Sequence, residues 1–250
     1  MDTIAATELL KENSAHVLAL VNVVGSSLAR MADSVFYLHV GPEIGVASTK
    51  AYLGMLVGQL LLAKHWDSAN KLDVSFDEIA ELPKLIEQTM ACEKQIKDIS
   101  EKIYKKNDIY FIGRGLDYAL AAEGALKLKE ISYLHAEALA AGELKHGTLA
   151  LIEDGTPIIV TASQNHLLDK TTSNVQEVIA RGAYVIAIGD NQSEKLENIS
   201  DEYVTLPDSN EFLTTVISII PLQFIAYHVA NLNGESIDQP RNLAKSVTVE

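Results

Sequence analysis

The stretch of chain richest in groups that can carry a proton is EGALKLKEISYLHAEALAAGELKH, which runs from Glu123 to His146. Lys127 and Glu130 are three residues apart, a spacing that places two side chains on one face of a helix. A carboxylate with a lysine and a histidine nearby suits proton transfer at a carbon next to a carbonyl, because neighbours can tune each group toward neutrality. The alternatives are an ordinary solvated helix face with surface ion pairs and a structural histidine.

The C-terminal segment Asp238–Glu250, DQPRNLAKSVTVE, holds a further candidate group, Lys245. Pro240 prevents a preceding helix from continuing through this segment. A frayed end is the usual state of a terminus. The apolar residues of this one instead favour a segment that folds back over the body, where Lys245 would be desolvated and nucleophilic.

A tight turn, Gly113-Arg114-Gly115, follows a short apolar run. It is a poor dinucleotide fingerprint, because Tyr118 stands where the third glycine is needed. A strand-to-helix junction of this kind offers free backbone N–H groups, which can bind an anion or a sugar hydroxyl. A plain tight turn is the equally weighted alternative.

The composition excludes several classes of protein. The chain has 250 residues, 48% of them hydrophobic, and a formal net charge of -14. Such a charge disfavours general binding to nucleic acid or to an anionic membrane surface. Cys92 is the single cysteine, so an internal disulfide and a multi-cysteine metal site are excluded, and the seven histidines show no metal-ligand spacing. We therefore expect no metal and no organic cofactor.

No targeting or membrane-spanning segment is predicted. The N-terminal residues have the periodicity of an amphipathic helix and lack the basic-then-apolar order of a signal peptide. The longest apolar stretches, Ala51–Ala63 and Val216–Ala230, are too short or too often interrupted to cross a bilayer. These patterns favour a cytoplasmic protein.

The first half of the chain predicts few strands. Residues 16–23 and 35–40 are apolar runs of strand length, and the serines at 26–27 can cap a short helix between them. Helical spacing follows over 48–64, with Ser48 or Thr49 as its cap. One long helix or two, rich in Glu and Lys, are predicted over 76–105 as a connector. Two strands are too few for an independent sheet with both faces buried.

In the second half, strands and helices alternate regularly. This pattern predicts βαβ units and a three-layer α/β/α fold with a parallel sheet. The predicted strands are 108–112, 157–162, 184–188 and 203–206, and the predicted helices are 118–133, 168–181 and 212–230.

Three motifs resemble the sugar-isomerase half of the glutamine:fructose-6-phosphate aminotransferases, also called glucosamine-6-phosphate synthases. They are GPEIGVASTKAY over residues 41–52, the stretch 123–147 and the segment 238–250. The resemblance implies two sugar-isomerase (SIS) domains of flavodoxin-like topology, of which the first is incomplete. The expected organisation is a partial first SIS domain over 1–72, a helical connector over 73–99, a second SIS domain over 100–237 and a catalytic tail over 238–250.

The resemblance also implies an activity, the conversion of fructose 6-phosphate to glucosamine 6-phosphate, with ammonia from a glutaminase domain. Glu130 would move a proton between C1 and C2, Lys127 would assist it, and Lys245 would form a Schiff base with the open-chain sugar. His146 would open the sugar ring in the site of the partner subunit of a homodimer. The residues implied to line the sugar site are Ser48, Val46 and Ala244.

Two departures from this family qualify the resemblance. The family's glutaminase uses an N-terminal cysteine, whereas this chain has only Cys92. The family's Ser/Thr-rich phosphate loop, of the form SQSGET, is absent, so we expect the chain to begin inside the first SIS domain. A separate glutaminase or N-terminal chain is then an expected partner. The alternative is a truncated, catalytically silent SIS protein that binds a phosphosugar or only dimerises.

Overall fold

The structure, a computed structural model, describes residues 1–246. The segment 247–250, which ends the predicted catalytic tail, lies outside the described residues. The chain divides into two compact units. The first comprises Met1–Asp73 together with the tail from Arg241, and the second comprises Val74–Pro240.

The first unit contains a two-stranded parallel sheet with helices before, between and after its strands. Its elements are α1 (Asp2–Glu12), β1 (Leu18–Val21), α2 (Ser27–Met31), β2 (Ser34–Tyr37) and α3 (Lys50–Trp66). Both strands are shorter than predicted. The predicted cap of the short helix is confirmed, because the Ser26 hydroxyl accepts a hydrogen bond from the backbone N–H of Ala29 at 3.3 Å.

The predicted connector forms three helices in succession, α4 (Phe76–Ala80), α5 (Leu82–Met90) and α6 (Glu93–Ile103). Ser75 and Glu78 form a reciprocal capping box at the start of α4. Pro83 lies in the first turn of α5, where its missing N–H costs no helical hydrogen bond. The expectation of one long helix or two is therefore wrong: the chain breaks a second time near Cys92.

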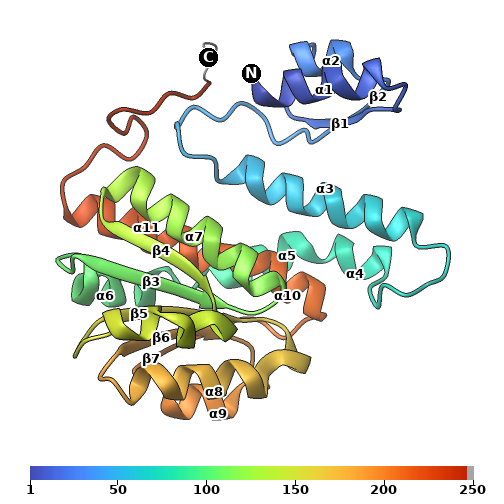
Figure 1. Cartoon of the computed structure of the whole chain (residues 1–250). Helices are drawn as coiled ribbons and strands as arrows, with labels where there is room; N and C mark the ends of the chain where they lie inside the picture. The colour runs from blue at the N-terminus through green and yellow to red at the C-terminus, as the bar shows by residue number, and fades with distance from the viewer. Residues whose placement is uncertain (247–250) are drawn as a thin grey trace. The chain divides into compact units, whose positions relative to one another are not determined.

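The second unit is built on a five-stranded parallel sheet with the strand order β4-β3-β5-β6-β7 (Figure 1). The strands are β3 (Asp108–Gly113), β4 (His135–Ala140), β5 (Pro157–Ala162), β6 (Tyr184–Gly189) and β7 (Glu202–Thr205). The α-helices that follow α6 are α7 (Leu116–Ser132), α8 (Leu168–Ile179), α9 (Glu194–Ile199), α10 (Glu211–Ile217) and α11 (Ile219–Leu232). Two short 3₁₀ helices, η1 (Ala141–His146) and η2 (Thr148–Leu151), join β4 to β5, and η3 (Asn165–Leu167) precedes α8.

The two faces of this sheet are covered by different helices, which confirms the three-layer prediction. Successive side chains of β3 point to opposite faces. Phe111 points toward α7, since a Cβ built on Gly124 would meet its ring at 3.1 Å. Tyr110 belongs to a buried cluster with Leu144 of η1 and Val175 of α8. Thus α7 covers one face and η1 with α8 covers the other, and α11 packs against α7 and α6 (Figure 1).

The most apolar helical stretch is Glu211–Leu232, which is 22 residues long with a mean hydropathy of 1.6. By length and composition it is sufficient to cross a membrane. The prediction that the apolar stretch Val216–Ala230 is too short or too interrupted to do so is therefore wrong, because the helical stretch is longer. In the structure 78% of its most apolar window is buried inside the protein. Such burial is what a core helix shows, and this stretch supplies Leu222, which packs on the α7 glycine, Gly124.

Candidate functional site

Lys127 lies between two carboxylates on one face of α7. Its Nζ atom is 2.7 Å from Glu130 Oε2 and 3.4 Å from Glu123 Oε1. The three residues meet because side chains three and four positions apart are neighbours on a helix. The lysine side chain is only 5% exposed. The solvated-face alternative is therefore wrong for Lys127, and the prediction that Lys127 and Glu130 share one face of a helix is confirmed.

The electrostatics of this cluster differ between its members. Burial raises the pKa of Glu123, against the lowering effect of Lys127, and the charge of Glu130 raises it further. Glu130 lies in the last turn of α7, which ends at Tyr133 in a left-handed conformation with φ of 62°. The side chain of Glu130 is 22% exposed, while its Oε2 atom, which Lys127 holds, is buried.

In the first unit, the carboxylate of Glu43 binds two of the predicted site residues, Ser48 and Lys245. Its carboxylate accepts hydrogen bonds from Ser48 Oγ at 3.0 Å and from the backbone N–H groups of Thr49 and Ala51 at 2.9 and 3.3 Å. It also accepts one from Lys245 Nζ at 2.7 Å. The carboxylate thus caps α3, and the expectation of a side-chain cap from Ser48 or Thr49 is wrong.

The negatively charged form of the Glu43 carboxylate is strongly favoured. Burial acts to raise its pKa, but the hydrogen bonds from Lys245, Thr49, Ala51 and Ser48 lower the pKa to about 2. The sequence analysis gave Glu43 no role. It stands five residues before Ser48 within GPEIGVASTKAY, and no local spacing relates it to a lysine 202 positions later.

The tail folds back onto the first unit, as predicted, through the Lys245–Glu43 ion pair. The side chain of Lys245 is 41% exposed, so the expectation of a desolvated amine is wrong. Of the predicted sugar-site residues, Val46 lies in the loop between Glu43 and Ser48, and Ala244 is the exposed neighbour of Lys245.

The expected convergence of His146 with Lys127 and Glu130 is wrong within one chain. His146 ends η1, which packs with α8 on the face of the sheet opposite α7. Its side chain is 74% exposed, with Nε2 3.9 Å from a Glu143 oxygen. The preceding residue, Lys145, is anchored to α8 by a 2.9 Å ion pair with Glu177. An exposed imidazole is thus presented outward by a fixed turn.

The turn Gly113-Arg114-Gly115 is occupied by the protein's own groups. The N–H of Leu116 donates to Gln164 Oε1 at 2.6 Å. Asp117, 1% exposed, follows in the first turn of α7 and accepts hydrogen bonds from Ser163 at 2.6 and 3.1 Å. Because these groups already have hydrogen-bond partners within the protein, the structure favours a structural turn.

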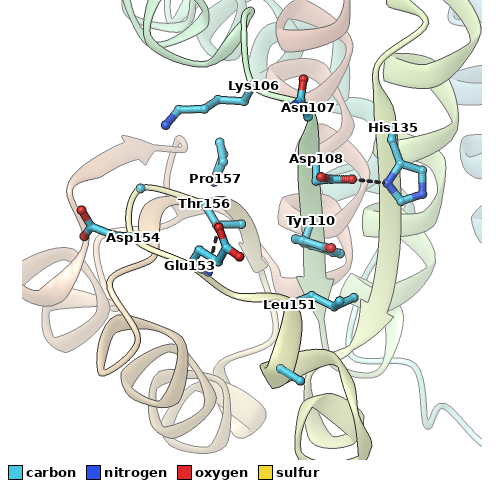
Figure 2. Close-up of a pocket in the computed structure, with 12 residues that line it drawn as sticks. Lys106, Asn107, Asp108, Tyr110, His135, Leu151, Glu153, Asp154, Thr156 and Pro157 are labelled. Carbon is cyan, nitrogen blue, oxygen red and sulfur yellow. Dashed lines mark hydrogen bonds and ion pairs between the residues drawn. The ribbon is translucent and has the colours of Figure 1, made fainter.

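A cavity of about 540 Å³ opens where β3, β4 and β5 begin (Figure 2). His135 and Asp108 lie next to each other in its wall, with His135 Nδ1 2.7 Å from Asp108 Oδ1. Lys106, Glu153 and Tyr110 also contribute to its lining (Figure 2). The cavity is lined by none of the predicted site residues. Positively and negatively charged side chains both line the cavity, so its charge does not indicate one class of ligand.

The fold is that of a known family of proteins. The model of the SIS domain matches residues 1–64 and 102–232, and the chain belongs to the SIS domain family. Over its whole length the chain is similar to glutamine–fructose-6-phosphate aminotransferases [isomerizing]. It is 48% identical to that of Pyrococcus horikoshii over 251 residues and 47% identical to that of Thermococcus kodakarensis over 255 residues. The chain spans 42% of the length of each of these proteins.

Solved structures agree with this similarity. The C-terminal domain of glucosamine-fructose-6-phosphate aminotransferase from Francisella tularensis superimposes with a TM-score of 0.88 at 38% identity, over 95% of this chain and 69% of that one. Glucosamine-6-phosphate deaminase from Thermotoga maritima gives a TM-score of 0.75 at 23% identity, covering 98% of this chain and 70% of that one, and shares the fold. The similarity thus falls on the C-terminal, SIS part of the aminotransferases.

Proposed function

We propose that this chain is the isomerase portion of a glutamine–fructose-6-phosphate aminotransferase. It would convert fructose 6-phosphate to glucosamine 6-phosphate with ammonia supplied by a glutaminase. The observation that carries the proposal is the match of the whole chain, at 43 to 48% identity, to eight aminotransferases of that name. A catalytically silent SIS protein is disfavoured, because the relatives matched over the whole chain are aminotransferases.

Glu130 is the base that moves a proton between C1 and C2 of the sugar. Support comes from its position: one carboxylate oxygen is held by Lys127, while the side chain keeps access to solvent. A carboxylate fixed in one orientation is placed to accept a proton from carbon. Lys127 orients this base and offsets the negative charge that develops on the sugar oxygens.

Lys245 is the amine that forms a Schiff base with the open-chain ketose, and Ser48, Val46 and Ala244 line the sugar site. Support comes from the first unit, where Ser48 and Lys245 bind the same carboxylate, that of Glu43. One sugar-binding residue and the reactive amine are thereby brought within reach of one small molecule.

His146 opens the sugar ring in the site of a second copy of the chain. Its separation from Glu130 by the sheet supports this assignment, because no rotation of an exposed side chain carries it through a buried core. We accordingly propose a homodimer, a separate or fused glutaminase as partner, and a location in the cytoplasm, where the phosphosugar substrate is found.

Deuterium exchange tests the proposed reaction directly. The chain is incubated with fructose 6-phosphate in D₂O, and the sugar is followed by NMR. We expect deuterium at C1 of the ketose and at C2 of an aldose phosphate, since the base exchanges its proton with solvent. Borohydride added to the mixture should reduce the imine and leave the sugar on the peptide that contains Lys245. A chain that binds the sugar but gives neither exchange nor a trapped imine is the silent SIS protein.

A further inference from the structure

The carboxylate of Glu43 is shared by the proposed reactive amine and the start of a helix. Its Oε2 atom accepts hydrogen bonds from Lys245 Nζ at 2.7 Å and Ser48 Oγ at 3.0 Å. Its Oε1 atom accepts from the backbone N–H groups of Thr49 and Ala51. The side chain is 10% exposed. Four donors from α3, its preceding loop and the tail therefore fix one carboxylate in one orientation.

These donors keep Glu43 negative. The first turn of α3 presents unsatisfied N–H groups and the positive end of the helix dipole, both of which favour an anion. With a pKa of about 2, the carboxylate stays ionised throughout the pH range in which a sugar phosphate is handled. A group that does not accept a proton there serves as a fixed charge rather than as a base.

Imine formation leaves the positive charge at Nζ unchanged. The ammonium and the ketose carbonyl combine to give a protonated iminium and one water. The nitrogen lone pair released by loss of a proton bonds C2, the C2–O bond breaks, and the oxygen leaves with two of the three ammonium protons. The third proton stays on nitrogen. A carboxylate beside Nζ therefore stabilises the positive charge both on the ammonium before the reaction and on the iminium after it.

We propose that Glu43 is the positioning residue and counter-ion of Lys245, holding the tail on the start of α3 and stabilising the iminium formed with the sugar. This inference rests on the proposed Schiff-base role of Lys245. It deepens that role in two respects. Lys245 lies on the C-terminal tail, 202 positions from Glu43, so its amine needs an anchor on the first unit. The iminium that it forms is positively charged, so it needs a fixed negative charge beside it.

Amine labelling tests the pair without any sugar. Wild-type chain and the Glu43→Gln, Glu43→Asp and Glu12→Gln variants are treated briefly with acetic anhydride at pH 8. Modification of Lys245 is measured by mass spectrometry relative to Lys195, whose side chain is 77% exposed. The Glu43→Gln change removes the carboxylate that holds Nζ in a 2.7 Å charge-assisted hydrogen bond, so we expect Lys245 to be labelled about tenfold faster. Glu12 is an exposed residue of the same unit, and its variant should match the wild type.

Borohydride trapping with fructose 6-phosphate then tests the iminium. We expect at least about tenfold less trapped sugar in Glu43→Gln, because the iminium loses its counter-charge. Glu43→Asp, which keeps the charge but withdraws it by one methylene, should give intermediate values in both assays. If Glu43→Gln does not fold, as judged by thermal unfolding, the Glu43→Asp variant decides.

The outcomes separate the two proposals. Labelling and trapping at wild-type levels in the folded variants overturn the role of Glu43. A wild-type chain that traps no sugar counts against the proposed function itself. In that case the labelling rates, measured without sugar, still decide whether Glu43 is the partner of Lys245.

Discussion

The ammonium group of Lys127 lies 2.7 Å from the carboxylate of Glu130, one turn away on α7, and both belong to the same cluster as Glu123. Two partly buried carboxylates thus share one buried cation. Because a buried charge without a partner is strongly unfavourable, this lysine has a structural task as well as the proposed catalytic one.

Replacing Lys127 by Met should destabilise the protein by roughly 3 kcal/mol, because it leaves two partly buried carboxylates without their cation. Urea unfolding measures the change. Lys84→Met is the matched control, since Lys84 is 69% exposed and its carboxylate partner Glu81 is 3.8 Å away, so a change within about 0.5 kcal/mol is expected. Equal small effects of the two substitutions would contradict the structural task of Lys127.

The Glu130→Gln variant should lose deuterium exchange at C1 by a factor of about 100 or more while binding of fructose 6-phosphate remains measurable. The amide keeps the shape of the side chain but cannot accept the proton. Isothermal titration reports binding and NMR reports exchange. Glu101→Gln, an exposed position on α6, should behave as wild type. Undiminished exchange in Glu130→Gln would remove this residue from the role of base.

Mixing two inactive variants should restore activity if His146 serves the site of a partner subunit. Glu130→Gln and His146→Asn are each expected to be inactive in isomerisation. After denaturation together and refolding in equal amounts, half of the dimers are mixed and each has one intact site, so about a quarter of wild-type activity should return. Recovery of none, with dimers present by light scattering, would place His146 and Glu130 in the same subunit's site or outside the reaction.

Acid should weaken the contribution of Glu43 to stability. Its pKa in the folded protein is about 2, below the ordinary value of 4.5, so its contribution is complete above pH 4.5 and is lost as the pH falls toward 2. The full contribution is on the order of 3 kcal/mol. The difference in free energy of unfolding between wild type and Glu43→Gln should shrink by about 2 kcal/mol between pH 6 and pH 3. A difference that stays constant would mean that the carboxylate gains nothing on folding.

Much of the second unit could be predicted because hydrophobic periodicity is a local property. The predicted strand 157–162 coincides with β5, and the other predicted strands differ from those observed by one residue at one or both ends. The strand β4 was missed because its sequence, HAEALA, contains three Ala and one Glu, residue types that are depleted in strands. It forms at the edge of the sheet, where pairing with β3 alone is enough to order it.

The alternation of strands and helices, the parallel sheet and the shared helix face of Lys127 and Glu130 could be predicted, because each depends on spacing along a short piece of chain. Which ionisable groups meet depends instead on long-range packing. It placed Glu130 and His146 on opposite faces of one sheet, since the face that a connection covers is chosen by packing. It also joined Lys245 to Glu43, 202 positions apart, through a contact that no local pattern encodes.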